Sequence, residues 1–367
     1  MDLMHAGLKD FLLLQKYSQE EQVGCLSIEN PFPNWFKKFT LALPYTLGLH
    51  LRREYRHLSM AFQAFKLKEC PTLFLFEVYL QNLFLLLPLL ALTRKKVLIS
   101  LHWNQQLARY SKLKYLGLAY LRLFLKWFNF KAIVFEIDDD VIPQKYRLSP
   151  ETKIVLPMPV RSDAYPKLKP GERLSPASKL KIGVVGKVRK DKPIAKLIES
   201  LKTYVETQNS ELELIIGTPR AQQSDYLKQL GVTVRDTTSE TDYLGLLNEL
   251  DILVAYYDEV RYYYRTSGVV SDAACSGCYV IASDYPTIAH QITAPVEVGA
   301  TFSSFEEIGS IVDRAIPQIR ERGQDLHWVW RETRSIDAIA KILFPQDRDS
   351  ATEFSNGTER QQTLARQ

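Results

Sequence analysis

The second half of the chain alternates strand-like and helix-like segments, and this alternation limits the fold more than any other feature. Helical patterns such as 193–206 and 241–250 lie between segments rich in β-branched residues. The strand-like segments are 179–186, 212–217, 232–236, 252–257, 279–284 and 296–302. Strands that alternate with amphipathic helices form a doubly wound parallel sheet, which binds ligands at the carboxyl ends of its strands. The sequence therefore predicts an α/β fold with its binding site at that edge.

The first half has the same rhythm in a less regular form. Its strand-like segments are 22–29, 72–79, 95–102, 131–138 and 152–159, with longer helical stretches between them. Because 367 residues exceed what one core usually supports, two domains are expected. Residues 168–178, rich in Pro, Gly and Ser, are the predicted linker. We thus predict two Rossmann-like domains facing each other across a cleft, at 1–167 and 178–344, and a disordered tail at 345–367.

Positive charge is concentrated in the first half. Of the net charge of +5, residues 1–160 contribute +8, from 21 Lys and Arg against 13 Asp and Glu, and the remainder contributes −3. Such an excess favours an anionic surface or substrate, so a membrane face, a phosphorylated acceptor and nucleic acid are the candidates. No zinc-finger, helix-turn-helix or RNA-recognition pattern accompanies the charge, so we expect no nucleic-acid partner.

Two basic amphipathic segments carry part of this charge. Residues 49–68 and 111–131 mix Lys and Arg with Leu, Phe and Tyr at helical spacing. Helices of this kind either lie on anionic lipid or face the core with a solvated basic edge. Both interpretations fit the sequence.

The apolar stretch at 71–93 is long enough to span a bilayer. Four residues interrupt it: Glu77, Gln81, Asn82 and Pro88. A buried strand followed by a buried helix is therefore favoured over a membrane span. No signal peptide opens the chain, so the expected location is the cytoplasm, with a peripheral position at the inner face of the membrane as the alternative.

The four cysteines do not predict a disulfide framework. Cys275 and Cys278 have the spacing of a redox or zinc pair, but the second close pair that a zinc site needs is missing. A helix end built from small residues is the favoured interpretation.

A lysine-containing loop follows the strand at 179–186. Gly186 allows a sharp turn, after which Lys187 and Lys192 can converge on one anionic group at the end of the strand. The pattern suits a diphosphate, although a solvated loop is equally compatible with it. It is not the dinucleotide fingerprint, because the segment lacks G-x-G-x-x-G.

A second anion-binding pattern begins at Arg265. Ser267 is a good N-cap, and the backbone amides of Ser267, Gly268 and Val269 are expected to face an anion in front of the helix. The Arg265 side chain can reach the same oxygens. Asp272 lies one turn further along the helix, where a carboxylate can accept hydrogen bonds from sugar hydroxyls. The alternative is an ordinary capped helix.

Together these two segments resemble the GT-B glycosyltransferases, most closely the retaining group of family 4 that uses nucleotide-sugar donors. Its members have a strand, a glycine and two basic residues at the start of the donor domain. Gly186, Lys187 and Lys192 match this pattern, with Lys in place of the family's Arg. A later signature is a pair of glutamates eight positions apart, of which Asp272 matches the second and Tyr264 replaces the first.

The resemblance assigns a role to each of these residues. In the family the second acid holds the nucleotide ribose, which implies that role for Asp272. The first acid contacts the transferred sugar, and Tyr264 cannot replace its charge. Donor binding is therefore better supported than transfer, and the turn that begins at Arg265 is the candidate replacement for the lost contact.

The resemblance covers about residues 7–342 and extends into the first half. Residues 97–105 resemble the family's strand that ends in a histidine, which implies a catalytic role for His102 near the donor sugar; the alternative is a structural histidine. Members also begin with a strand and a glycine-rich loop, whereas the opening residues here indicate the helix that follows. Either the start is assigned too late or this element is missing.

The expected function is transfer of a hexosyl group from an NDP-sugar to a lipid-linked or polysaccharide acceptor. The resemblance implies retention of configuration. Asp138, Asp139 and Asp140 follow a strand, as the metal-binding D-x-D motif of the GT-A fold does, but two Rossmann-like halves do not suit that fold. We therefore expect neither a metal nor an organic cofactor. The alternatives are a nucleotide-sugar epimerase of the same fold and a non-catalytic nucleotide-sugar-binding or membrane-scaffold protein.

Overall fold

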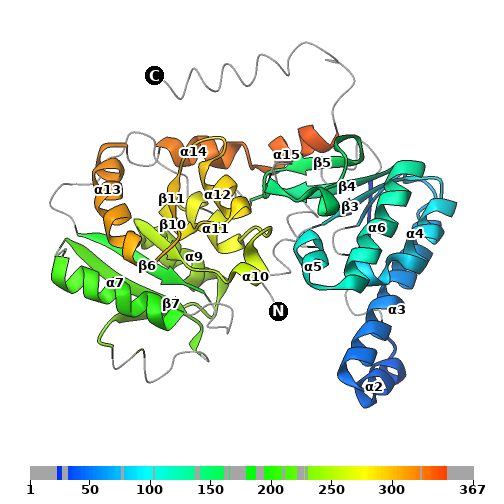
Figure 1. The fold of residues 1–367 in the computed structure, drawn as a ribbon, viewed down its shortest axis with the longest axis horizontal. Helices are drawn as coiled ribbons and strands as arrows, with labels where there is room; N and C mark the ends of the chain where they lie inside the picture. The colour runs from blue at the N-terminus through cyan, green and yellow to red at the C-terminus, as the bar shows by residue number, and fades with distance from the viewer. Residues whose placement is uncertain are drawn as a thin grey trace, which may run out of the picture. The chain divides into compact units, whose positions relative to one another are not determined.

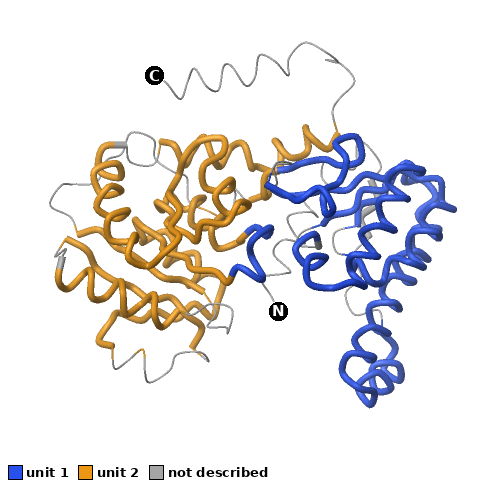
Figure 2. Tube along the Cα trace, viewed as in Figure 1, with its two compact units in different colours: residues 1–156, 259–266 blue, residues 157–258, 267–367 orange. Residues whose placement is uncertain are grey.

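A computed structural model describes a large part of the chain. The described residues are 23–26, 32–75, 78–101, 104–136, 141–160, 165, 179–186, 194–208, 211–220, 227, 230–322 and 325–344. The chain divides into two compact units (Figure 2). Unit 1 comprises Met1–Leu156 and Glu259–Thr266, and unit 2 comprises Pro157–Asp258 and Ser267–Gln367.

Unit 1 contains a five-stranded sheet in which every pair of neighbours is parallel. Its order is β1 (Val23–Leu26), β2 (Thr72–Leu75), β3 (Lys96–Ser100), β4 (Phe130–Phe135) and β5 (Lys153–Leu156). The central strand β3 is buried from Val97 to Ser100. Continuous apolar runs of this kind are typical of parallel strands that are covered on both faces.

Helices connect the strands of unit 1 (Figure 1). They are α2 (Asn34–Ala42), α3 (Tyr45–Lys66), η1 (Leu80–Asn82), α4 (Leu83–Leu92), α5 (Asn104–Tyr110), α6 (Lys112–Trp127), η3 (Gln144–Tyr146) and η4 (Pro150–Thr152). Helix α10 (Glu259–Tyr262) also belongs to unit 1, although it follows β9 of unit 2 in the chain. The apolar stretch at 71–93 is thus divided between β2, η1 and α4. Within the described residues, no helix has the length and apolar character to cross a membrane.

Two helix crossings in unit 1 require glycine. A Cβ atom on Gly48 of α3 would lie 2.0 Å from the carbonyl oxygen of Thr40 in α2. A Cβ atom on Gly117 of α6 would lie 1.9 Å from the carbonyl oxygen of Leu80. In both places backbone meets backbone, so neither neighbour can move aside as a flexible side chain could.

Unit 2 contains a six-stranded parallel sheet with the order β11-β10-β9-β6-β7-β8. The strands are β6 (Leu180–Val185), β7 (Leu212–Thr218), β8 (Thr233–Asp236), β9 (Ile252–Ala255), β10 (Tyr279–Ser283) and β11 (Gly299–Phe302). All six strands that the sequence predicts for this half are present. From β6 the next two strands are added on one side and β9 to β11 on the other, so the strand order reverses between β6 and β9. The carboxyl ends of these two strands form the topological switch point where ligands bind in such folds.

The helices of unit 2 cover both faces of this sheet. They are α7 (Ile194–Gln208), α9 (Glu240–Glu249), α11 (Gly268–Cys275), α12 (Pro286–Thr293), α13 (Glu306–Arg322), α14 (Asp325–Glu332) and α15 (Ile336–Leu343). Helices α7 and α13 share one apolar cluster with the strands, whereas α11 packs against α9, α12 and α14.

The segment Glu259–Thr266 differs from the expected domain division. The sequence places it inside 178–344, but its contacts group it with unit 1. The side-chain amide of Gln106 donates to the carbonyl oxygens of Glu259 and Val260, at 3.2 and 2.6 Å. The Tyr264 hydroxyl donates to the carbonyl oxygen of Val141 at 2.7 Å. These bonds hold the segment to α5 and to the loop after β4.

Candidate functional site

The carboxyl end of β6 requires glycine. Gly186 follows the strand with φ 139°, a backbone conformation that other residues rarely adopt. Its amide donates to the carbonyl oxygen of Gly217 at 3.0 Å, so the sheet pairing continues up to the turn. Lys187 and Lys192 lie outside the described residues, and their convergence on an anion stays a prediction.

The amino-terminal end of α11 is fixed to the neighbouring strand β9. Tyr257 lies two residues beyond β9 and is fully buried. Its hydroxyl is 2.5 Å from the hydroxyl of Ser267, and Ser267 is the N-cap of α11, as the sequence predicts. The Tyr257 amide in turn donates to the Ser283 hydroxyl at the end of β10. The start of α11 therefore lies at the carboxyl edge of the sheet, where β6 and β9 are neighbours.

Gln291 of α12 fixes the backbone of Ser267 from the other side. Its side-chain oxygen accepts from the Ser267 amide at 3.1 Å, and its nitrogen donates to the Ser267 carbonyl oxygen at 2.9 Å. The expectation that the Ser267 amide faces an anion is therefore wrong, because this donor is already used within unit 2. Ser267 acts as the cap, and its hydroxyl accepts from the amide of Val270.

Two amides remain at this helix end. Within the described part of the chain, no acceptor is found for the amides of Gly268 and Val269. Gly268 is exposed and Val269 is half-buried, and a Cβ atom on Gly268 would meet nothing within 4 Å. Because the helix dipole places positive potential at this end, the two amides can bind an anion such as a phosphate.

Asp272 is held by two tyrosines. Its carboxylate accepts hydrogen bonds from the hydroxyls of Tyr165 and Tyr243, the latter at 2.7 Å. Burial raises the pKa of the Asp272 carboxyl, while these two hydrogen bonds act in the opposite direction. Each carboxylate oxygen can accept a second hydrogen bond. A role in ribose binding is thus compatible with the geometry and stays a prediction.

The residues just before α11 belong to unit 1. The guanidinium of Arg265 lies over the ring of Tyr262, 5.0 Å from its centroid. Tyr264, at the position where the family has its first glutamate, is buried and forms part of the unit 1 core. The guanidinium of Arg109 lies 5.4 Å from the Tyr264 ring. The structure therefore gives Tyr264 a packing role. A role for Arg265 in donor binding stays a prediction.

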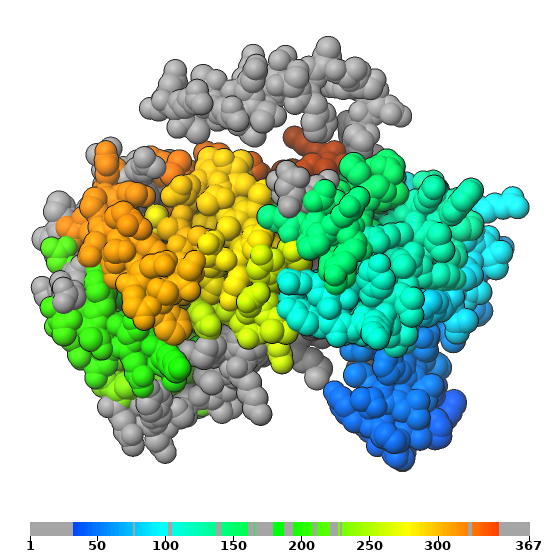
Figure 3. Space-filling model, viewed as in Figure 1, coloured from blue at the N-terminus to red at the C-terminus, as the bar shows by residue number. Residues whose placement is uncertain are grey.

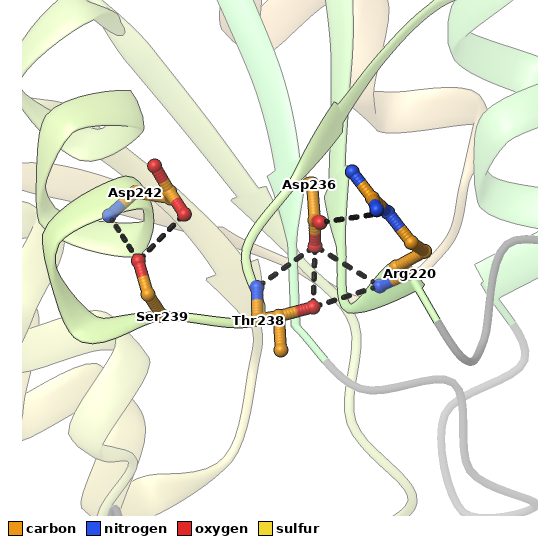
Figure 4. A network of polar contacts seen from close by, with 5 residues as sticks. All are labelled: Arg220, Asp236, Thr238, Ser239 and Asp242. Carbon is orange, nitrogen blue, oxygen red and sulfur yellow. Dashed lines mark hydrogen bonds and ion pairs between the residues drawn. The ribbon is translucent and has the colours of Figure 1, made fainter.

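A polar network fixes the turns at the carboxyl ends of β7 and β8 (Figure 4). The Asp236 carboxylate accepts from the amides of Arg220 and Thr238, at 3.0 and 2.9 Å, and from the Thr238 hydroxyl. It also pairs with the Arg220 guanidinium at 3.3 Å. The Thr238 hydroxyl is the main cause of a lowered Asp236 pKa. Sequence reasoning missed this network, although Asp, Thr and Ser in succession are a signal for such turns.

The remaining predicted site residues fall into two groups. His102 and the three aspartates at 138–140 lie outside the described residues, so their roles stay predictions. Cys275 and Cys278 are buried, and burial raises the pKa of both thiols. The Cys278 sulfur donates to the carbonyl oxygens of Leu247 and Leu250. These contacts agree with a helix end built from small residues. Among the described residues, no group of His, Cys, Asp and Glu is arranged to hold a metal ion.

Comparison with known proteins identifies the fold. No protein-family model matches the chain, and no curated protein matches it by sequence. Several solved structures do match the chain. Sucrose-phosphate synthase from Thermosynechococcus elongatus matches with a TM-score of 0.55 and 14% identity, over 86% of this chain and 79% of that chain. The galactosyltransferase WaaB of the lipopolysaccharide outer core, in its apo form, matches with a TM-score of 0.54 and 14% identity, over 80% of both chains.

A third match has a nucleotide bound. HepE from Anabaena, in complex with UDP, matches with a TM-score of 0.51 and 14% identity, over 84% of this chain and 82% of that chain. These proteins have the GT-B fold. The chain therefore has the GT-B fold, with one parallel sheet and its helices in each unit, and this confirms the predicted fold class.

Proposed function

We propose that the protein is a glycosyltransferase that moves a hexosyl group from a nucleoside-diphosphate sugar to a lipid-linked or polysaccharide acceptor. The observation that carries the proposal is the GT-B fold, together with two amides at the switch point of unit 2 that have no described acceptor. HepE is named in complex with UDP, and WaaB is named as a galactosyltransferase. Both support a nucleotide-sugar donor for this chain.

The proposed chemistry depends on the departing diphosphate, which gathers negative charge as the sugar leaves. The amides of Gly268 and Val269 stabilise this charge at the start of α11. Lys187 and Lys192 supply positive charge from the loop after β6, and Arg265 supplies it from the segment before α11. Asp272 accepts hydrogen bonds from the ribose. The proposed reaction needs no metal, because these groups carry the counter-charge.

The remaining parts of the proposal concern the sugar and the acceptor. His102 is proposed to assist at the donor sugar by hydrogen bonding or by general acid and base catalysis. Retention of configuration is proposed from the resemblance to the retaining group. The basic helices of unit 1 favour an acceptor with an anionic or membrane-bound carrier.

A panel of donors tests the proposal. UDP-, GDP-, ADP- and dTDP-sugars are titrated calorimetrically and assayed for hydrolysis with the wild-type protein, Lys192→Ala and Lys196→Ala. Lys196 is an exposed residue of α7 and is the matched control. One donor class is expected to bind and to be hydrolysed. Lys192→Ala should weaken its binding by about tenfold, because a charge-assisted contact is lost, and Lys196→Ala should leave binding unchanged.

Two results would overturn the proposal. If no nucleotide sugar binds, the proposed donor site is wrong. If Lys192→Ala and Lys196→Ala bind the donor equally well, Lys192 does not contact it. Release of free NDP during turnover separates a transferase from an epimerase, which keeps its nucleotide sugar intact.

A non-catalytic nucleotide-sugar-binding protein is the second candidate, and one observation favours it. Tyr264 is buried and its hydroxyl bonds to Val141, so no carboxylate is available where the family has its first glutamate. This candidate would be supported if the protein binds a donor tightly but hydrolyses it only at the background rate, even when cell extracts that contain acceptors are present.

A further inference from the structure

Helices α2 and α3 form a hairpin that extends from the rest of unit 1 (Figures 1 and 3). Residues 32–53, which contain α2 and the first part of α3, are called the hairpin here. Both helices begin after a proline, Pro33 for α2 and Pro44 for α3. The chain thus turns back on itself within two residues, Leu43 and Pro44.

The inner side of the hairpin is tightly packed. The rings of Phe36 and Tyr55 have centroids 4.7 Å apart, and Gly48 lets the backbones of the two helices touch. The Arg52 guanidinium donates to the Thr40 hydroxyl at 3.2 Å. These contacts fix α2 on α3, so the outward side chains are held on a defined surface.

The outer side of the hairpin exposes large apolar side chains. Five residues form this apolar tip: Trp35, Phe39, Leu41, Tyr45 and Leu47, with exposed fractions of 67, 51, 65, 76 and 49%. Trp35 and Phe39 are four residues apart and lie on one face of α2. Single exposed apolar residues are ordinary, but three aromatic and two leucine side chains on one protruding element indicate a partner.

The charge of the hairpin shows which kind of partner fits. Lys37, Lys38, Arg52 and Arg53 are basic, and residues 32–53 contain no Asp or Glu. An anionic bilayer complements both properties at once, since its headgroups attract Lys and Arg while Trp and Tyr settle at the boundary with the acyl chains.

We propose that the α2–α3 hairpin binds the surface of a membrane that contains anionic phospholipids, with the apolar tip inserted among the headgroups. Lys37 and Lys38 lie beside the inserted side chains and contact the phosphates. The hairpin attaches the protein to one face of the bilayer without crossing it. This inference does not rest on sugar transfer, because a protein without activity would bind through the same surface.

Vesicle binding by the full-length protein tests the inference. Sedimentation is measured with vesicles of phosphatidylcholine alone and with vesicles that also contain phosphatidylglycerol. The variants are Trp35→Ser/Phe39→Ser and Lys37→Gln/Lys38→Gln. The matched control is Trp328→Ser/Val329→Ser on α14 of unit 2, whose side chains are 37 and 40% exposed. Circular dichroism confirms that each variant is folded.

The wild-type protein should sediment with the anionic vesicles and much less with the neutral ones. Loss of Trp35 and Phe39 should weaken binding by about tenfold or more. Loss of two lysines should weaken it by a similar factor, at about fivefold for each charge near the surface. The α14 control should bind like the wild-type protein. Brominated lipid should quench the wild-type fluorescence more than that of Trp35→Phe.

Several results would overturn the inference. These are undiminished vesicle binding by the folded tip variant, equal loss of binding in the α14 control, and equal binding to neutral vesicles. Self-association that the tip variant abolishes, without any effect on vesicle binding, would assign the surface to a protein partner. Donor titration without vesicles is a separate measurement, so the donor site and the membrane surface can fail independently.

Discussion

At the residue scale, the start of α11 allows a single backbone donor to be removed. Gly268 is the first residue of the helix, and Ser267 before it has an extended backbone, with φ −118° and ψ 121°. Proline is well tolerated at such a position and lacks the amide hydrogen. Gly268→Pro should therefore weaken binding of the donor nucleotide by about tenfold, the effect of one lost hydrogen bond to a charged group. Calorimetric titration measures this.

The control for this prediction is Gly268→Ala. Alanine keeps the amide hydrogen, and its Cβ atom meets nothing within 4 Å. Affinity for the nucleotide should stay close to that of the wild-type protein. Equal affinity of the proline and alanine variants would show that the Gly268 amide does not contact the phosphates.

His327 connects the stability of unit 2 to pH. Its Nε2 donates to the carbonyl oxygen of Cys278 at 2.8 Å, and its Nδ1 is buried with no partner among the described residues. Burial lowers the His327 pKa from 6.5 to about 4. In this pH range the unfolded chain binds a proton that the folded chain does not, so the free energy of unfolding falls as the pH drops from 6.5 to about 4.

The difference between the two pKa values, 6.5 and about 4, corresponds to about 3 kcal/mol of unfolding free energy. His327→Gln should show a smaller fall in unfolding free energy over the same pH range, measured by urea denaturation at several pH values. His50→Gln is the control for removal of a histidine elsewhere. The same pH dependence in wild type and His327→Gln would contradict the prediction.

At the element scale, Gly48 is the residue on which the α2–α3 hairpin depends most. In Gly48→Ala the new Cβ atom would lie 2.0 Å from the Thr40 carbonyl oxygen, so α2 must move away from α3. The variant should lose about 1–3 kcal/mol of unfolding free energy, as overpacked contacts do. It should also bind anionic vesicles less tightly.

Gly245 provides the opposite case. It is an exposed residue of α9, and a Cβ atom there meets nothing within 4 Å. Gly245→Ala should stabilise the protein by about 0.5–1 kcal/mol, because alanine restricts the unfolded chain and favours the helix. Urea denaturation measures both variants. A Gly48→Ala protein as stable as Gly245→Ala would show that the crossing tolerates separation.

Local signals in the sequence account for the elements that could be predicted. Alternation identifies the six strands of unit 2, and the Ser267 cap marks the start of α11. Amphipathic spacing identifies α3 and α6. Each of these signals lies within a few neighbouring residues, which explains why the sequence alone was sufficient.

The features that could not be predicted depend on residues far apart in the chain. Gln291 uses the Ser267 amide from 24 residues away, and Tyr165 reaches Asp272 from 107 residues away. No local sequence pattern predicts such pairs. The packing of the α2–α3 hairpin could not be predicted for another reason. Pro33 and Pro44 indicate where its helices begin, but they do not indicate how the two helices pack.

At the scale of the whole molecule, the proposed reaction should proceed without a divalent metal. The reason is that the proposed counter-charges for the diphosphate are Lys and Arg side chains and backbone amides. Donor binding and hydrolysis should therefore be unchanged in excess EDTA. A loss of activity that Mg²⁺ or Mn²⁺ restores would contradict this and would direct attention to Asp138 and Asp140.

The assignment of Glu259–Thr266 to unit 1 has a consequence for synthesis on the ribosome. Unit 1 is encoded mostly before residue 157, yet its core includes Tyr264. Tyr264 can therefore join the core of unit 1 only after residues 259–266 have been synthesised. A fragment truncated after Leu156 would lack residues 259–266 and so would leave the core of unit 1 incomplete. Because exposed apolar surface prolongs contact with chaperones, this fragment should stay bound to them for longer than the complete chain.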